Sequence, residues 1–431
     1  MKSVKVGLIG MGTIGTGVAK ILLGKSEMIS RRTGKKIDLV KICDRDTTAD
    51  RGVALPPGVM TSDLSEIMDN REISIVIELI GGIETARKFV LMALEKGKNV
   101  VTANKALIAN CGAELFAKAR EVGRTIGFEA SVCGGVPVLA SLQTSLLANK
   151  IDSIQAICNG TCNFVLSQME SVNVSYADAL KEAQRLGFAE ANPTLDVDGT
   201  DSTQKLAILA QLAFGATPDW QKIPRVGVDV VDAIDIRFAK ELGRRIRLLA
   251  IAERTDEGLA LKVTPTLVPE NSVLAMVTNA FNAIRIVGDS VGPVFYEGWG
   301  AGQLPTASAV CSDVIDCALG RTKITFDSLR LWSAERESVP IMDANKIRSR
   351  AYLRFNVEDK PGVLAEISTA LGRHGVSIAA MHQHAKANPD DKLASIIIVT
   401  YDAPADALQA ALDEVAPIPY IGKPVCLSVR D

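Results

Sequence analysis

A glycine-rich loop near the amino-terminal end constrains the fold of this chain more than any other feature. Its pattern is G-x-G-x-x-G, from Gly10 to Gly15. A buried strand pattern, Val4–Ile9, leads into it, and a helical pattern, Thr16–Leu22, follows it. In that setting Gly10 permits a tight turn, Gly12 lets a pyrophosphate approach the backbone, and Gly15 lets helix and strand pack closely. The loop therefore predicts a Rossmann-type dinucleotide-binding domain of the α/β class.

The ends of later strands carry residues that would meet a cofactor. The predicted strand Ile37–Cys43 ends at Asp44, an acid that would bind the ribose 2′-hydroxyl of NAD, whereas Arg45 beside it would pair with the 2′-phosphate of NADP. The choice between NAD and NADP therefore stays open. Gly81 and Lys105 each follow a further strand, at the edge where open parallel sheets bind ligands. For Lys105 a helix-capping role is the alternative.

Length and charge exclude several classes of protein. At 431 residues the chain is long enough for roughly two to four domains. Lys plus Arg total 48 and Asp plus Glu total 50, so no charge imbalance indicates a nucleic-acid partner. No apolar run approaches the roughly 20 residues that cross a bilayer, and the amino terminus lacks the apolar core of a signal peptide. We therefore expect a cytoplasmic protein with no membrane partner.

Cysteine and histidine usage restricts the chemistry. The eight cysteines are scattered through apolar stretches without zinc-site spacing, which predicts reduced thiols. The three histidines are His374, His382 and His384, all close to the carboxyl-terminal end. Chemistry upstream of them must therefore use Lys, Asp, Glu, Tyr or a thiol as its acid and base.

The acidic stretch Asn192–Leu206 is the strongest candidate for that chemistry. It contains Asp196, Asp201 and Lys205, and after Thr203 the chain becomes apolar at helical spacing. Because Asp201 and Lys205 are four residues apart, they would share one face of a helix. The alternative is an exposed ion pair that contributes about 0.3–0.5 kcal/mol.

From about residue 138 the strand pattern changes. Ile151–Ile157, Leu259–Leu267 and Ala283–Val291 alternate apolar and polar residues, as antiparallel strands with one wet face do. They predict an α+β substrate and dimerisation domain with a mixed or antiparallel sheet. The helix predicted at Ala307–Leu319 is expected to return to the nucleotide domain.

The last 82 residues, 350–431, have the order of a ferredoxin-like βαββαβ unit. The polar stretch 321–349 before them predicts a linker. We therefore place the dinucleotide-binding domain at 1–137 plus 303–320 and the substrate domain at 138–302.

A candidate cation site follows the strand Thr125–Ser131. Glu129 and the carbonyl groups of the turn Val132–Pro137 are hard oxygen ligands of the kind that alkali and alkaline-earth cations take. A purely structural turn is the alternative.

Taken together, these residues resemble homoserine dehydrogenase in its monofunctional form with a carboxyl-terminal ACT domain. The similarity covers nearly the whole chain, and its most specific part is the pattern Asp-x-x-Gly-x-Asp-x-x-x-Lys at 196–205. The segments that carry it are Gly10–Gly15, Thr102–Lys105, Glu129–Val136, Asn159–Thr161, Asp196–Lys205, Gly300–Gly302 and Asp359–Leu364.

The resemblance implies an enzyme that interconverts L-homoserine and L-aspartate 4-semialdehyde with NADP or NAD, on the route to threonine and methionine. It implies Lys205 as the acid/base and places Lys105 and Asp201 in the same catalytic site. The implied cofactor-binding residues are Gly10, Gly12, Thr13, Ile14, Gly15, Asp44, Arg45, Gly81, Lys105 and Gly302. The implied substrate-binding residues are Gly160, Thr161, Glu190, Asp196, Asp201 and Lys205.

The resemblance also implies two further sites and an assembly. A sodium ion would be held by Glu129, Val132, Gly134 and Val136. An amino-acid effector, L-threonine, would bind the ACT domain at Asp359, Gly362, Val363 and Leu364. Paired ACT domains and a sheet-based interface would give a homodimer or homotetramer.

Two alternatives share this layout. One is a dehydrogenase for another amino-acid semialdehyde or a 3-hydroxy acid. The other is a non-catalytic sensor of NAD(P) and amino acids, which would need no acid/base beside the nicotinamide.

Overall fold

The computed structural model describes residues 3–383 and 393–431, so His384 lies outside the described residues. The chain forms two compact units. Unit 1 comprises residues 1–153, 204–221 and 281–339, and unit 2 comprises 154–203, 222–280 and 340–431. Each unit is described by itself.

Unit 1 is built on a parallel sheet whose six strands lie in the order β3-β2-β1-β4-β5-β6. This is the doubly wound order in which ligands bind at the carboxyl ends of the strands, where the strand order reverses. That reversal lies between β1 and β4. The strands are β1 (Ser3–Ile9), β2 (Lys36–Cys43), β3 (Met60–Thr61), β4 (Ile73–Glu78), β5 (Asn99–Thr102) and β6 (Ile126–Gly127).

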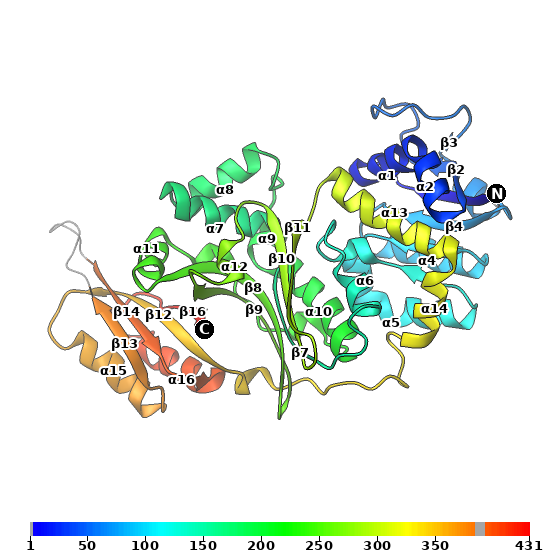
Figure 1. Cartoon of the computed structure of the whole chain (residues 1–431). Helices are drawn as coiled ribbons and strands as arrows, with labels where there is room; N and C mark the ends of the chain where they lie inside the picture. The colour runs from blue at the N-terminus through cyan, green and yellow to red at the C-terminus, as the bar shows by residue number, and fades with distance from the viewer. Residues whose placement is uncertain (1–2, 384–392) are drawn as a thin grey trace. The chain divides into compact units, whose positions relative to one another are not determined.

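The helices of unit 1 cover this sheet. Helix α13 (Gln303–Leu319) packs beside α1 (Thr13–Gly24), as Figure 1 shows, and buries Val310 and Val314 in the same core as Val18. The predicted return of this helix to the nucleotide sheet is thus present. Unit 1 also contains α2 (Ser26–Thr33), α3 (Ser65–Met68), α4 (Glu84–Glu95), α5 (Lys105–Glu121), α6 (Val138–Gln143), α14 (Arg321–Leu329) and the hairpin β10 (Phe281–Gly288) and β11 (Gly292–Trp299).

Unit 2 contains a mixed sheet in the order β8-β9-β16-β12-β14-β13. Strand β16 runs parallel to β9, and the other neighbours are antiparallel. The ACT sheet is therefore continuous with the hairpin β8–β9. The strands are β8 (Arg244–Thr255), β9 (Gly258–Pro269), β12 (Arg348–Glu358), β13 (Ile378–Gln383), β14 (Leu393–Thr400) and β16 (Val425–Val429), with β15 (Ala403–Pro404) paired to β12.

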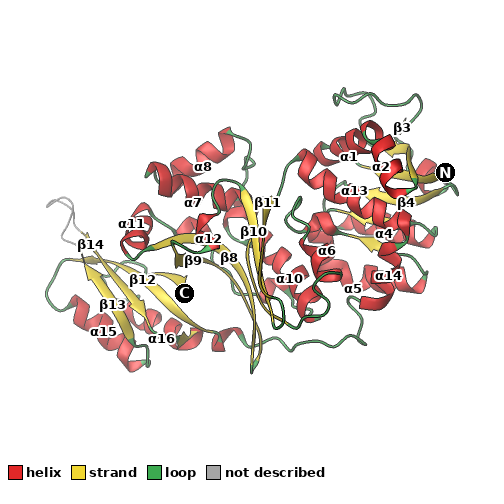
Figure 2. Cartoon of the chain, in the orientation of Figure 1, coloured by secondary structure: helices red, strands yellow, loops and turns green. Residues whose placement is uncertain are grey.

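The helices of unit 2 fall into two groups. In the ACT part, α15 (Val363–Arg373) and α16 (Ala405–Val415) lie side by side on the sheet, as Figure 2 shows. The others are α7 (Gly160–Val172), α8 (Tyr176–Arg185), α9 (Thr194–Val197), α11 (Ala233–Glu241) and α12 (Val273–Met276). Strand β7 (Ile151–Ile157) and helix α10 (Thr200–Phe214) each contribute residues to both units. The predicted fold class is confirmed, whereas the exact domain boundaries stay a proposal.

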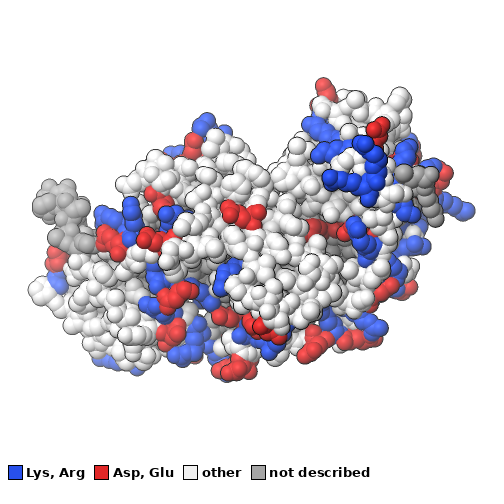
Figure 3. Space-filling model, viewed as in Figure 1, with Lys and Arg blue, Asp and Glu red and all other residues white. Residues whose placement is uncertain are grey.

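The surface carries both signs of charge. On the face drawn in Figure 3, lysine and arginine are mixed with aspartate and glutamate over much of the surface, and the upper right carries mainly lysine and arginine. None of the helices in residues 3–383 and 393–431 combines the length and apolar character that a bilayer-spanning helix needs.

One buried ion pair connects α11 to the ACT strand β12. Asp235 is fully buried and accepts hydrogen bonds from the Arg354 guanidinium at 2.7 and 3.1 Å. It also accepts the Tyr352 hydroxyl at 2.8 Å and the backbone N–H of Asp232 at 2.9 Å. Both oxygens of this carboxylate are therefore engaged, as a buried charge requires.

A partly buried cation lies where β9 meets β16. The Lys262 ammonium donates to Ser428 Oγ at 2.9 Å. Burial, with the nearby Arg430, lowers the pKa of Lys262 to about 8 from the usual 10.5. Between those pH values the unfolded chain holds this proton and the folded chain has lost it, so the Lys262 contribution to stability rises with pH.

Replacing Lys262 by methionine should remove that rise. We expect the melting temperature of the wild type minus that of Lys262→Met to increase as pH increases from about 8 to about 10. Thermal unfolding of both proteins across this range measures the difference. The exposed Lys240→Met is the control. If the melting temperatures of the wild type and of Lys262→Met change in parallel with pH, the lowered pKa of Lys262 is wrong.

Candidate active site

The glycine loop has the geometry of a phosphate cradle. Gly10 has a φ of +96° and donates its N–H to the Cys43 carbonyl at 2.9 Å. A Cβ on Gly15 would lie 2.1 Å from the Gly10 carbonyl oxygen, whereas one on Gly12 would meet nothing within 4 Å. Thr13 is the first residue of α1, so the open side of the loop faces the amino terminus of a 12-residue helix. A pyrophosphate fits such a site.

Replacing Gly15 by alanine should weaken binding of NADPH and NADH. The added methyl group meets backbone, which moves only at a cost of about 1–3 kcal/mol. If the nucleotide-bound state bears this cost, the dissociation constant increases by about 5- to 150-fold. Nucleotide fluorescence titration measures it. The control is Gly24→Ala in the same helix, where a Cβ would meet nothing within 4 Å. Equal affinities for the two variants would contradict the cradle.

Asp44, at the end of β2, is tied to this loop. Its Oδ2 accepts the Met11 N–H at 2.5 Å. Arg45 is exposed, and a different arginine, Arg51, contacts both loop and acid, with 2.7 Å to the Met11 carbonyl and 3.4 Å to Asp44. Arg51 lies in a loop with no strand or helix pattern, so the sequence gives no signal for this contact.

A cavity of about 330 Å³ lies at the carboxyl ends of β4 and β5, where Ile14, Gly81 and Lys105 contribute to its wall. A hydrogen-bond network shapes its edge. Glu78 accepts the Thr102 hydroxyl at 2.8 Å, and burial raises the pKa of its carboxyl. Thr102 in turn accepts the Asn104 N–H at 3.0 Å.

Asn104 fixes the start of helix α5 beside this cavity. Its side-chain oxygen caps α5 by accepting the Leu107 N–H at 3.0 Å, and its nitrogen donates to the Gly82 carbonyl at 2.6 Å. Lys105 is therefore held at the first helical residue, at the predicted ligand-binding edge.

Unit 2 brings the predicted substrate acids together around one amide. The Asn159 side-chain nitrogen donates to Asp196 and to Asp201, at 2.9 Å each. Its oxygen caps helix α7 by accepting the Cys162 N–H at 2.8 Å. Asp201 is buried and Asp196 is partly exposed. One asparagine thus fixes two carboxylates, which is an arrangement suited to an ammonium group.

The remaining predicted substrate residues occupy different surroundings. Gly160 is the first residue of α7, and the hydroxyl of the buried Thr161 donates to the Phe188 carbonyl at 2.6 Å. Glu190, two residues beyond Phe188, is exposed. Lys205 is partly exposed and follows Asp201 by one turn of the unbroken helix α10.

Glu129 is buried, but its side chain already has partners. Its two carboxylate oxygens accept the N–H groups of Leu139 and Ala140, at 3.1 and 2.6 Å, in the first turn of α6. Its own N–H donates to Asp313 at 2.8 Å. Burial raises the pKa of Glu129 to about 7 and that of Asp313 well above its usual value.

The turn that follows Glu129 meets the turn before α13. Gly135 donates its N–H to the Trp299 carbonyl at 3.0 Å, and a Cβ on Gly134 would lie 2.5 Å from the Gly300 carbonyl oxygen. Val132 and Val136 are buried in this turn. Gly302 precedes α13 with a φ of +107°. In the described residues, no cluster of three or more His, Cys, Asp or Glu side chains could hold a metal, so backbone carbonyls would have to supply most ligands.

Known proteins with the same organisation identify the family. A homoserine dehydrogenase of Pseudomonas aeruginosa is 40% identical over 428 residues, which cover 99% of this chain and 98% of that protein. The chain belongs to the homoserine dehydrogenase family. Residues 10–129 match the NAD-binding domain of homoserine dehydrogenase, residues 137–315 match homoserine dehydrogenase, and residues 351–419 match the ACT domain. The protein is therefore an oxidoreductase.

Solved structures of homoserine dehydrogenases agree with this assignment. The enzyme of Thiobacillus denitrificans is 40% identical to this chain and has a TM-score of 0.91. The match covers 100% of this chain and 99% of that enzyme. A hyperthermophilic archaeal homoserine dehydrogenase in complex with NADPH is 28% identical to this chain and has a TM-score of 0.62. The match covers 74% of this chain and 98% of that protein.

The predicted effector turn of this homoserine dehydrogenase lies between β12 and α15. Gly362 has a φ of +95° and precedes the helix, Val363 is buried in the ACT core, and Leu364 is partly buried against it. Asp359 is exposed. Within the turn, Lys360 lies 5.4 Å from the centre of the Tyr420 ring, so the turn contacts the chain beyond α16.

Proposed function

We propose that the chain interconverts L-homoserine and L-aspartate 4-semialdehyde with NAD(P)(H), in the biosynthesis of threonine and methionine. The observation that supports this substrate is the pair of carboxylates held by Asn159, of which Asp201 lies one helical turn before Lys205. An amino-acid aldehyde carries an ammonium for such carboxylates and a carbonyl that a lysine can protonate. Membership of the homoserine dehydrogenase family supports the same reaction.

Each site residue has a role in this proposed reaction. NAD(P)H supplies the hydride that reduces the aldehyde. Asp196 and Asp201 bind the substrate ammonium, with Glu190, Gly160 and Thr161 completing the site. Lys205 donates the proton to the carbonyl oxygen, and in the reverse direction it removes that proton from the alcohol. Lys105, at the edge of the nucleotide cavity, stabilises the negative charge that develops on oxygen.

NADP and NAD are both candidates for the cofactor. The archaeal relative binds NADPH, and Arg45 is exposed beside Asp44, which supports NADP. The engagement of Asp44 with Met11 keeps an acid at the predicted ribose position, which supports NAD.

A sodium ion is proposed at the turn after Glu129. Two carboxyl groups lie together at this turn, since the N–H of the buried Glu129 donates to Asp313 at 2.8 Å, and a positive charge nearby would offset the cost of burying them. Since the Glu129 side chain caps α6, backbone carbonyls of Val132, Gly134 and Val136 would be the main ligands. Replacing sodium chloride by choline chloride should then lower the melting temperature.

Regulation and assembly complete the proposal. L-Threonine binds at the turn of Asp359, Gly362, Val363 and Leu364 and inhibits the enzyme, and the ACT domains pair in a homodimer or homotetramer in the cytoplasm. Inhibition curves with L-threonine for the wild type and Asp359→Ala, and light scattering for the mass, test these two statements.

The experiment that tests the reaction follows the absorbance of reduced nicotinamide while purified protein meets L-homoserine. NAD and NADP are used in separate reactions. An increase would support the reaction and rank the cofactors. A flat trace from protein that binds nucleotide would indicate another semialdehyde or the sensor.

A further inference from the structure

The amino-terminal end of α7 contacts the acidic stretch through more than the Asn159 amide. The thiol of Cys162, in the first turn, donates to the main-chain carbonyl of Asp196 at 3.2 Å. The hydroxyl of Thr161 beside it donates to the Phe188 carbonyl at 2.6 Å. Asn159, Thr161 and Cys162 are all buried. The loop that carries Asp196 is therefore attached to the start of one helix at three points.

Asp196 is held at both of its oxygen-bearing groups. Asn159 donates to its carboxylate at 2.9 Å, and Cys162 donates to its carbonyl, so the side chain and the backbone are both constrained. Asp201 accepts the same Asn159 amide at 2.9 Å, and its backbone is fixed because it is the second residue of α10. The separation of the two carboxylates thus depends on Asn159, and the place of Asp196 depends also on Cys162.

An amide is well suited to hold these two acids. Carboxylates brought to one site repel each other. A side-chain amide has two N–H donors and no charge, so Asn159 contacts both acids without neutralising either. Its oxygen accepts the Cys162 N–H at 2.8 Å, which fixes the orientation of the amide. A serine at this position would offer one donor.

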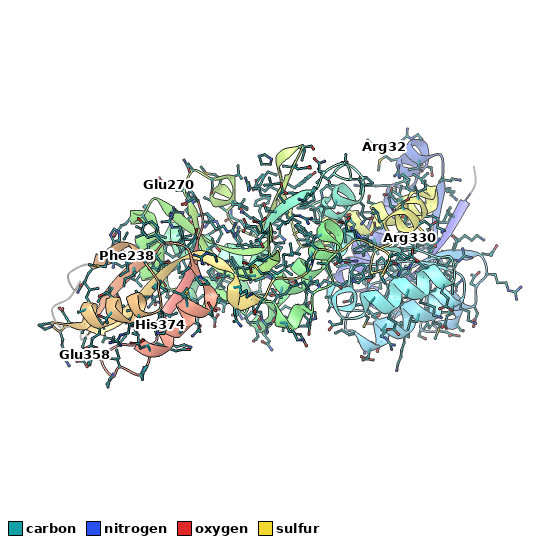
Figure 4. The ribbon with its side chains drawn as sticks, turned by 90° about the horizontal axis from the view of Figure 1, so that it is seen from below. Arg32, Phe238, Glu270, Arg330, Glu358 and His374 are labelled. Carbon is teal, nitrogen blue, oxygen red and sulfur yellow. The ribbon has the colours of Figure 1, made fainter. Side chains whose placement is uncertain are left out.

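Helix α7 is a rigid support for these contacts. Its Glu170 pairs with Arg245 at 3.0 Å and with the fully buried Arg247 at 3.1 Å. The helix packs against α8 and α11, and Phe238 of α11, which Figure 4 labels, is buried. Side chains on an element that is packed in this way hold a site more precisely than side chains on a loop.

We propose that Asn159 and Cys162 are positioning residues that make the enzyme selective for a substrate with an α-ammonium group. The inference rests on the proposed function, in which Asp196 and Asp201 bind that ammonium. Asn159 sets the separation of the two carboxylates and Cys162 fixes the backbone of one of them. When either contact is lost, the acids move from the positions that suit an ammonium. A ligand without an ammonium loses nothing by that movement.

Binding of L-homoserine and of 4-hydroxybutanoate to the complex with NADPH tests the proposal. 4-Hydroxybutanoate is L-homoserine without its ammonium group. Because NADPH cannot accept a hydride, both ligands bind without reacting. Isothermal titration calorimetry of the full-length chain gives the two dissociation constants, and we expect the wild type to bind L-homoserine more tightly than 4-hydroxybutanoate.

Asn159→Ser keeps a residue that caps helices well but removes one of the two donors. It should raise the dissociation constant of L-homoserine about 10- to 100-fold, the usual cost of removing the hydrogen-bond partner of a ligating side chain. Cys162→Ala should raise it about 2- to 10-fold, because a thiol is a weak donor. The dissociation constant of 4-hydroxybutanoate should stay unchanged in both variants.

The matched control is Asn163→Ser. Asn163 is a buried asparagine of the same helix, and its amide donates to the main-chain carbonyl of Asn279 at 2.9 Å. This variant should leave the ratio of the two dissociation constants unchanged. If Asn163→Ser lowers the ratio as much as Asn159→Ser does, or if Asn159→Ser weakens both ligands equally, the effect is a general disturbance of α7 and the proposal is overturned.

Three other results also decide the matter. Equal affinity of the wild type for the two ligands would overturn the proposal. Unchanged selectivity in Asn159→Ser or in Cys162→Ala would overturn the role of that residue. A wild type that binds L-homoserine selectively but does not oxidise it would contradict the proposed reaction, whereas the role of Asn159 and Cys162 in binding an ammonium would still be supported by the variants.

Discussion

Lys205→Ala should lower the turnover number by about 10²–10⁴-fold, the range that acid–base catalysis contributes. The nearest acid on its own helix face, Asp201, is already held by Asn159, so the carboxylates would keep their positions when the lysine is lost. Substrate KM and NADPH affinity should therefore change little. Initial rates in both directions, with nucleotide titration on the same protein, measure the effect.

Two variants separate a missing proton donor from a general disturbance. Lys181→Ala removes an exposed lysine from α8 and should leave the rate intact. Lys205→Arg keeps the charge but donates a proton poorly, because arginine stays protonated at all ordinary pH values. It should therefore be nearly as slow as Lys205→Ala. Unchanged turnover in Lys205→Ala would remove this lysine from the proposed mechanism.

Features that depend on local pattern could be predicted from the sequence. The loop Gly10–Gly15 requires a strand before it and a helix after it, and this requirement leads to a doubly wound sheet. The ferredoxin-like unit was predictable for the same reason, because its strands and helices alternate with clear periods. The acidic stretch was recognisable because Asp201 and Lys205 lie on one helix.

Other elements were missed because their local signal is weak. Residues 25–36 are mostly polar in sequence, yet Ser26–Thr33 is helix α2, with a single buried residue, Ile29, and a left-handed Gly34 at its end. The predicted linker begins with α14, whose Phe326 is buried. In each of these helices a single residue is buried, so no helical spacing of apolar residues marks the helix in the sequence.

The partners of the site residues were also beyond sequence reasoning. Asn159 holds acids that lie 37 and 42 residues away, and Asp313 meets Glu129 from 184 residues away. Glu78 was not singled out from the sequence, although its buried carboxyl supports Thr102 and thereby Lys105. Side chains of this kind have ordinary identities, and only the fold gives them a role.

Asp235→Ala should lower the free energy of unfolding of the α11 and ACT region by about 3–5 kcal/mol, because it leaves the Arg354 charge buried without its partner. Urea unfolding followed by far-ultraviolet circular dichroism includes this region together with unit 1, and tryptophan fluorescence reports unit 1 alone, because the three tryptophans all lie there. The loss should therefore appear in the circular dichroism transition and not in the fluorescence transition. Asp256→Ala, an exposed turn acid of unit 2, is the control. Replacing both charges, as in Asp235→Leu with Arg354→Met, should recover much of the loss, since apolar pairs often substitute for buried ion pairs. A loss below about 1 kcal/mol in Asp235→Ala would match an exposed pair and contradict the burial on which this prediction rests.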